Sequence, residues 1–172
     1  IKHPVKEGHA LIDASRLMAG VGNFELAKYA FGLEGVKLAF VYFDTDLKEW
    51  RVRDKTNRIW SLSNSPIREK DAFVYFDDSR CRGADMKLLP KAVGILTIGP
   101  KMCKDKLMQA AGRMQQLDQM QQIKIIGTQE VTKQIMRLNK LDNDKNVNSK
   151  HVLQWVMSNT IDSVALGGFM EW

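Results

Sequence analysis

Apolar residues occur along the chain in short runs that polar, turn-rich stretches separate. Nearly continuous apolar runs predict strands covered on both faces at residues 38–43, 72–76 and 92–98, and a further strand is expected at residues 123–126. A shorter run covers residues 10–12. Between these runs, apolar residues recur at helical spacing and predict helices at residues 24–31, 104–117, 129–138 and 150–159. Strands that alternate with helices indicate an α/β fold with a mostly parallel sheet and helices on both faces.

Polar residues indicate where two of these helices begin, and an alternating pattern predicts a hairpin. We expect Asn23 to cap the helix at residues 24–31 and Ser149 to cap the last helix, because a side-chain oxygen there accepts a hydrogen bond from a free backbone N–H. Two alternating segments flank the turn sequence DKTN and predict a β-hairpin inserted at about residues 50–62. The expected fold class is a three-layer α/β sandwich with a mostly parallel sheet and this inserted hairpin.

The length and the polar stretches predict how the chain is organised. A chain of 172 residues suffices for one domain with a substantial core. We expect an α/β domain at residues 1–138, a polar loop or linker at residues 139–149, and a C-terminal helix and tail at residues 150–172. Because the chain begins without Met, we interpret it as a domain of a larger parent protein.

The composition narrows the classes of partner. Hydrophobic residues make up 44% and charged residues 27%, as in ordinary globular domains. The net charge of +6 permits an acidic partner such as nucleic acid, but the basic residues are spread along the chain, which favours a solvated basic surface. No apolar run reaches the roughly 20 residues of a membrane helix, so no membrane association is expected.

The cysteines and histidines predict neither a disulfide framework nor a metal site. The chain has two cysteines, Cys81 and Cys103, which favours a reducing compartment and an intracellular, cytoplasmic protein. Neither cysteine has the paired spacing of a zinc site, and His3, His9 and His151 are scattered. We therefore expect no metal and no cofactor.

The loop at residues 77–85, with the sequence DDSRCRGAD, is the candidate functional region. It follows the apolar run at residues 72–76 directly. In a parallel sheet, ligands bind outside the carboxyl ends of the strands, and this loop is expected at such an end. Asp13 follows the run at residues 10–12 and is expected at the same edge, where Asp13, Asp77 and Asp85 could bind a metal or position Arg82. We favour an Arg–Asp network that holds the loop.

Two segments of the chain resemble the second RecA-like lobe of superfamily-2 helicases and translocases. The loop contains the sequence RGAD, and the later helix contains QAAGRMQQ, whereas the helicase lobes carry Arg-Gly-x-Asp and Gln-x-x-Gly-Arg-x-x-Arg. The resemblance implies a RecA-like fold and a set of ligand-binding residues: Arg80, Arg82, Gly83, Asp85, Gln109 and Arg113. Gln116 replaces the second arginine, and no Gly-x-x-x-x-Gly-Lys-Ser/Thr loop occurs, so nucleotide chemistry would need a partner lobe.

A closer resemblance spans His9 to about Val131. It is to a family of very large eukaryotic proteins, common in fungi and protists, that are generally described as ubiquitinyl hydrolases. The matching segments read ALIDASRL, VYFD, VYFDDSRCRGADMKL, and TIGP followed by KDKLMQAAGRMQQL. The resemblance implies cysteine-peptidase chemistry in active members. Arg80 stands where the family has His, Ala111 where it has Cys, and Gly8 where some members have Cys, so this copy is expected to be catalytically degenerate.

Cys81 is the remaining candidate nucleophile in this chain. It lies between Arg80 and Arg82, whose charges favour the thiolate form, and His9, Asp77 or Asp78 could act as its base. A small, partly buried loop residue is the alternative that we favour. Cys103 precedes a helix, and we expect it to have a capping or packing role.

These observations leave three hypotheses for the function. The first is a domain of a ubiquitinyl-hydrolase-like protein, with its catalysis lost and a binding or scaffold role retained. The second is a helicase-type lobe that binds nucleotide or nucleic acid with a partner lobe. The third is a purely structural part of a large assembly. The expected partners are the rest of the parent chain and ubiquitin or another protein, with nucleic acid less favoured.

Overall fold

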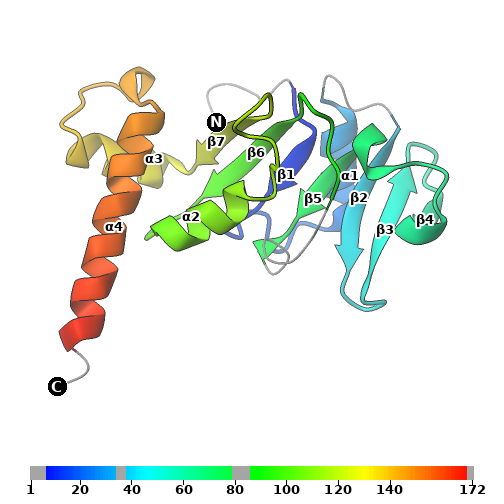
Figure 1. Ribbon diagram of the computed structural model, residues 1–172, viewed down its shortest axis with the longest axis horizontal. Helices are drawn as coiled ribbons and strands as arrows, with labels where there is room; N and C mark the ends of the chain where they lie inside the picture. Colours follow the sequence, from blue (N-terminus) through cyan, green and yellow to red (C-terminus); the bar gives the residue numbers. More distant parts are fainter. Residues whose placement is uncertain (1–6, 34–37, 79–85, 170–172) are drawn as a thin grey trace.

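The computed structural model describes residues 7–33, 38–78 and 86–169 of the chain. Within these residues a seven-stranded sheet runs through the molecule in the order β4-β3-β2-β5-β1-β6-β7 (Figure 1). The strands are β1 (Ala10–Ile12), β2 (Ala39–Asp44), β3 (Glu49–Asp54), β4 (Ile59–Ser61), β5 (Ala72–Phe76), β6 (Val93–Ile98) and β7 (Gln122–Gly127). The first strand of the chain therefore lies inside the sheet, between β5 and β6.

The sheet is mixed but mostly parallel. β2, β5, β1, β6 and β7 run in one direction, whereas β3 is antiparallel to β2 and β4 is antiparallel to β3. The predicted α/β class with a mostly parallel sheet is confirmed at this level. The predicted hairpin is also confirmed, because β3 and β4 pair around the turn that follows Asp54. This hairpin extends the parallel part of the sheet on the side of β2.

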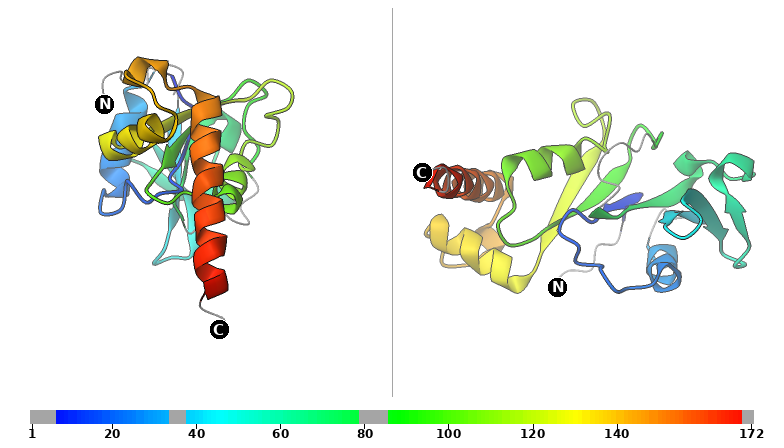
Figure 2. Two further views of the ribbon diagram at one scale, coloured as in Figure 1. Left: turned by 90° about the vertical axis from the view of Figure 1, so that its left-hand side faces the viewer. Right: turned by 90° about the horizontal axis from the view of Figure 1, so that it is seen from below.

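Helices cover both faces of the sheet, as Figure 2 shows from below. The helices are α1 (Asn23–Phe31), α2 (Lys104–Ala111), α3 (Gln129–Leu138) and α4 (Ser149–Phe169). α1 packs on one face with the cluster that contains Leu11, Phe40 and Phe73. The other three helices contribute to the cluster on the opposite face, which contains Ile12 and Leu96. All described residues of β5 and β6 are buried, as their continuous apolar runs predict.

Two helix lengths differ from the sequence prediction. α2 ends at Ala111 instead of residue 117, because Gly112 is its C-cap and turns follow it. The Gln121 side chain holds these turns: it accepts a hydrogen bond from the Gln116 N–H and donates one to the Leu89 carbonyl. α4 continues to Phe169 instead of residue 159. Its far end extends beyond the sheet (Figure 1), and residues 161–166 are exposed.

Both predicted helix caps are wrong by one residue. The N-cap of α1 is Gly22, without a side-chain hydrogen bond, and Asn23 is already helical. At α4 the carboxamide of Asn148 accepts hydrogen bonds from the N–H groups of Lys150 and His151, so Asn148 supplies the cap and Ser149 begins the helix. The predicted linker is partly packed, since Val147 lies against the core. None of the helices in the described part is both long and apolar enough to cross a membrane.

Candidate functional site

The carboxyl edge of the sheet brings three chain segments together. Ile12 is in register with Phe76 of β5 and with Leu96 of β6. The residues that follow these strands therefore emerge at one edge, which confirms that Asp13 and Asp77 share it. From here the chain continues from β1 to β2 on one side and from β6 to β7 on the other, with α1 and α2 on opposite faces. Such a switch point opens a crevice where α/β proteins bind ligands.

Asp13 anchors the loop that leaves β1. Its side chain is 1% exposed, and it accepts hydrogen bonds from the Leu17 N–H at 2.9 Å, from the Met18 N–H at 2.9 Å and from the Thr97 hydroxyl at 2.8 Å. Ser15 donates to the same Thr97 oxygen from its N–H and from its hydroxyl. The Asp13 carboxylate thus accepts from backbone amides and a hydroxyl, whereas the sequence suggested an arginine as its partner.

A cavity of about 350 Å³ lies beside this anchored loop. Its lining comes from the loop after β1, the turn after β2 and the end of β5: Asp13, Arg16, Ala19, Thr45, Tyr75, Asp77 and Asp78. Arg16 has a φ of 58°, in the left-handed region, and is exposed. Asp78 forms an ion pair with Lys106 of α2 at 3.3 Å, which ties the end of β5 to the helix on the other side of the edge.

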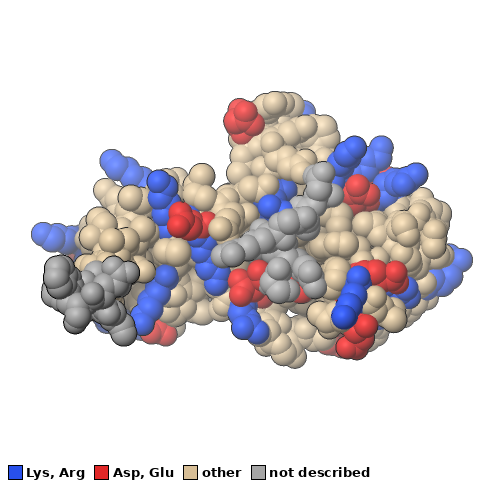
Figure 3. All heavy atoms as spheres, turned by 60° about the horizontal axis from the view of Figure 1, so that its bottom comes forward, with Lys and Arg blue, Asp and Glu red and all other residues tan. Residues whose placement is uncertain are grey.

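The charges around this cavity are mixed. Figure 3 brings the carboxyl edge forward and shows acidic side chains near its centre, with Lys and Arg side chains on both sides. Among the described lining residues, Asp77 and Asp78 are partly exposed beside one cation, Arg16. Carboxylates repel a phosphate and attract a cation, so this cavity suits a cationic or amide group better than a nucleotide phosphate. No group of three His, Cys, Asp or Glu among the described residues could hold a metal ion.

His9 lies at the opposite edge of the sheet from Asp77. It precedes β1, whose Ala10 is in register with Val74, so His9 is level with Phe73 and Asp77 is four residues further along. At about 3.3 Å per residue, this separation is roughly 13 Å. The Nδ1 atom of His9 accepts a hydrogen bond from the Val93 N–H at 3.0 Å. Burial lowers the pKa of His9, and Glu7 opposes this only in part. The structure therefore does not bring His9 and Asp77 together.

The remaining predicted site residues divide into two groups. Gln109 lies on α2, exposed and three residues after Lys106, so it is on the helix face next to the Lys106–Asp78 ion pair. Arg113 is half-buried in the turn after α2. Cys103 is the N-cap residue of α2 but makes no side-chain capping bond. The other candidates lie outside the described residues: Arg80, Cys81, Arg82, Gly83 and Asp85.

Three residues of this edge could not be predicted from the sequence. Thr97, which links Asp13 to Ser15, was visible only as the one hydroxyl in an otherwise apolar run. Arg16 and Thr45 line the cavity from turns that carry no motif. Their assembly depends on pairing between distant strands, and one sequence without aligned relatives contains no signal for it.

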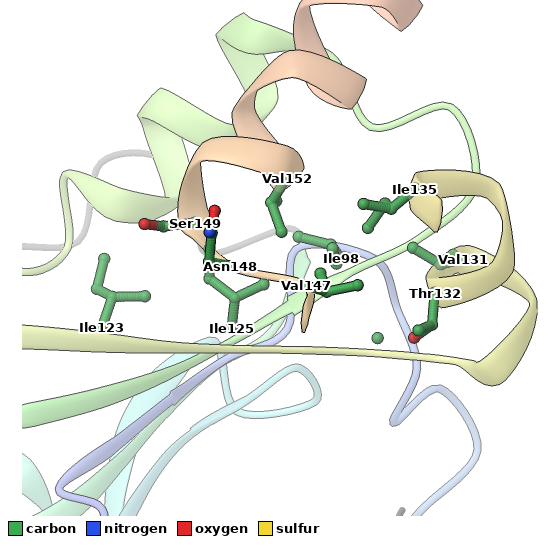
Figure 4. Close-up of a pocket in the computed structure, with 11 residues that line it drawn as sticks. Ile98, Ile123, Ile125, Val131, Thr132, Ile135, Val147, Asn148, Ser149 and Val152 are labelled. Atoms are coloured by element: carbon green, nitrogen blue, oxygen red, sulfur yellow. The ribbon is translucent and has the colours of Figure 1, made fainter. Parts of the chain in front are cut away.

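A second cavity, of about 300 Å³, lies between β7, α3 and the start of α4 (Figure 4). Most of its lining is aliphatic: Ile98, Ile123, Ile125, Val131, Ile135, Val147 and Val152, with Thr132, Asn148 and Ser149 as the polar lining residues. No lining residue is an acid or a base, so the cavity can accept an aliphatic group but offers no proton transfer. The alternation of Ile123 and Ile125 on the edge strand was the only sequence signal for it.

The comparisons with known proteins add no relative. No family model, no curated protein and no solved structure matches the chain. The fold and the site define an α/β domain with a mixed, mostly parallel sheet and a polar cavity at its carboxyl edge.

Proposed function

We propose that the chain is a binding domain of a larger, ubiquitinyl-hydrolase-like protein, and that it holds a protein partner at the carboxyl edge without cleaving it. The observation that carries this proposal is the anchored loop after β1, which Asp13 and Thr97 fix beside the polar cavity. A preformed loop costs little ordering on binding. Of the base candidates, His9 is at the other edge of the sheet, so the described geometry gives no support to hydrolysis assisted by this imidazole, whereas Asp77 is at the carboxyl edge.

The charge of the cavity selects the kind of partner. Asp77 and Asp78 favour a Lys or Arg side chain of a protein, and Arg16 and Thr45 can pair with the backbone or a carboxylate beside it. A nucleotide phosphate would meet carboxylates first. A protein ligand is therefore the better match, and ubiquitin is the first probe because of the family resemblance.

A titration with ubiquitin tests this proposal. We expect ubiquitin added to the 15N-labelled chain to shift the amide signals of Arg16, Thr45 and Asp77, at the carboxyl edge. The Asp77→Asn/Asp78→Asn variant should bind at least about tenfold more weakly, since a charged pair contributes roughly 1.5–3 kcal/mol. Glu69→Gln/Asp71→Asn is the matched control, because it removes the same two charges from the turn before β5, at the opposite edge.

Two results would contradict the proposal. If ubiquitin shifts no amide signals, or shifts only signals near the control residues, the carboxyl edge is not its binding site. Turnover of a fluorogenic ubiquitin substrate by the parent protein, abolished by Cys81→Ala, would show a working nucleophile and overturn the non-catalytic assignment. If the chain binds neither ubiquitin nor nucleotide, a purely structural role remains.

A second candidate is the second RecA-like lobe of a helicase-type protein. The order of the parallel strands, β2-β5-β1-β6-β7, with α1 and α2 on opposite faces, is compatible with a RecA-like arrangement. Gln109 lies on α2, the helix that Lys106 ties to the end of β5, and Arg113 follows it. Calorimetry of the parent protein with Mg-ATP separates the candidates: this one requires binding that Arg113→Gln weakens and that Asp77→Asn does not.

A further inference from the structure

The side of the hairpin that faces α1 carries cations where a parallel sheet carries apolar residues. Arg53 is directly opposite Phe40 and Arg51 directly opposite Tyr42, so both arginines lie on the face that α1 covers. α1 covers Phe40 and Tyr42 on β2. Figure 2 shows α1 beneath this part of the sheet, with β3 and β4 beyond it. The two arginines are half-buried at the side of the helix.

Aromatic rings of α1 meet these cations. Phe24 is 40% exposed, and its ring has the Lys28 Nζ at 4.3 Å and the Arg53 guanidinium at 5.2 Å from its centroid. Phe31 has the Lys55 Nζ at 5.9 Å. Phe24, Lys28 and Phe31 are spaced four and three residues apart, so they share one helix face. We call Phe24, Lys28, Phe31, Arg53 and Lys55 the basic–aromatic strip.

The positive charge of this strip is only partly neutralised. Glu25 pairs with Lys28 at 3.1 Å, and Glu49 pairs with Arg51. Arg53 and Lys55 have no ion-pair partner among the described residues. Arg53 makes one long hydrogen bond, from Nη1 to the Asn57 side chain at 3.5 Å, and its Nε has no hydrogen-bond partner in the described structure. The Nε atom is buried, so the Nη groups of the half-buried Arg53 side chain are the donors that a ligand can meet.

We propose that the basic–aromatic strip binds single-stranded nucleic acid. Arg53 and Lys55 bind phosphates, and an unpaired base stacks on Phe24 in place of the cations that now cover it. Both kinds of group are needed: an acidic protein surface would use the charges but not the rings, and a duplex hides its base faces. The strip is formed by α1 and the hairpin, apart from the carboxyl-edge cavity, so the inference goes beyond the proposed function.

Fluorescence anisotropy with a fluorescein-labelled 12-mer of oligouridylate tests the charges. We expect the full chain to bind this probe at low salt and Arg53→Gln/Lys55→Gln to bind it at least tenfold more weakly. Loss of two phosphate contacts also lowers the salt dependence, by about 1.4 in the slope of log K against log salt. Lys124→Gln/Lys133→Gln is the matched control, since it removes the same charge from exposed positions on β7 and α3.

Phe24→Leu tests the stacking separately from the charges. Since a stacked base contributes substantially and a leucine cannot stack, binding of the 12-mer should fall by about tenfold. Binding of heparin, which has charges but no bases, should not change. If Arg53→Gln disturbs folding by circular dichroism, Lys55→Gln alone, at an exposed turn position, should still lower the salt slope by about 0.7.

The inference is overturned if the 12-mer does not bind, if Lys124→Gln/Lys133→Gln weakens binding as much as Arg53→Gln/Lys55→Gln does, or if Phe24→Leu leaves the affinity unchanged. Equal binding of a duplex of the same length would also overturn it. Asp77→Asn should leave the affinity for the 12-mer intact, so a failure of ubiquitin binding and a failure of this inference are distinguishable.

Discussion

Asp13 and Asp54 are both nearly buried, and each organises a turn, but at very different range. The side-chain carboxylate of Asp54 accepts hydrogen bonds from Thr56 and Arg58, the shortest at 2.7 Å. All these side-chain partners lie within four residues of Asp54. Asp13 holds two N–H groups of its own loop and also the hydroxyl of Thr97, 84 residues further along the chain. The hairpin turn is therefore a local structure, whereas the loop at the candidate site depends on the folded sheet.

The difference shows that a buried aspartate can stabilise either a local turn or a contact between distant parts of the chain. Asp54 closes the β3–β4 turn at the rim of the sheet, and the hairpin could open there without disturbing the parallel strands. Asp13 connects the cavity wall to β6 inside the sheet. The carboxyl-edge cavity should thus keep its shape as long as the core is intact.

The largest expected effect comes from Asp13→Ala. It leaves two buried N–H groups and the Thr97 hydroxyl without their acceptor, which should lower the free energy of unfolding by about 3–5 kcal/mol. Urea unfolding followed by circular dichroism measures this loss. Thr97→Val, which removes the bond to Asp13 and the two bonds that Ser15 donates to the same hydroxyl oxygen, should cost about 1–3 kcal/mol. A loss below 1 kcal/mol for Asp13→Ala would show that the loop does not depend on this carboxylate.

Asp54→Ala should have a smaller, local effect. Burial would raise the pKa of Asp54, but the hydrogen bonds from Thr56 and Arg58 lower it more, which shows that the turn stabilises the ionised carboxylate. We expect faster hydrogen exchange of backbone amides in β3 and β4, with amide signals of the carboxyl edge unchanged. Faster exchange in β1 and β6 as well would mean that the hairpin and the parallel core unfold together.

The smallest expected effect concerns His9, a partly buried side chain at the other end of β1 that accepts a hydrogen bond from the Val93 N–H. Burial holds its pKa below the ordinary 6.5, so on acidification the unfolded chain takes up this proton first. Stability from His9 is therefore present above about pH 6.5 and falls as the pH drops below it. Unfolding free energies between pH 7.5 and 5.5 should decline less steeply for His9→Gln, whose carbonyl can still accept from Val93. Parallel pH profiles would contradict this role.

The sequence predicted features that depend on neighbouring residues. The apolar runs gave the parallel strands, and the turn after Asp54 gave the hairpin, because each pattern is complete within a few residues. The expected shared edge of Asp13 and Asp77 followed from strand direction alone. The partner of Asp13 could not be predicted, since Thr97 meets it only through the pairing of β1 with β6.

The predicted lengths of α2 and α4 were wrong for a related reason. The apolar spacing continues beyond Gly112, but the side chain of Gln121 returns to Gln116 and stabilises turns instead of helix. α4 is longer than its capping and packing residues indicated, since its residues 161–166 are exposed and do not pack on the rest of the domain. The end of α2 thus depends on a contact distant in sequence, the hydrogen bond from Gln121 to the Leu89 carbonyl, and the length of α4 on a lack of such contacts among the described residues.

The position of β1 also sets the order of events during synthesis. Residues 10–12 leave the ribosome before their strand partners, which are residues 74–76 and 94–96. Contacts so distant in sequence form slowly, because a long stretch of chain must be closed before they stabilise anything. The nascent chain therefore carries an apolar strand without its partners until β6 has emerged, and this interval is when a chaperone would have most to protect.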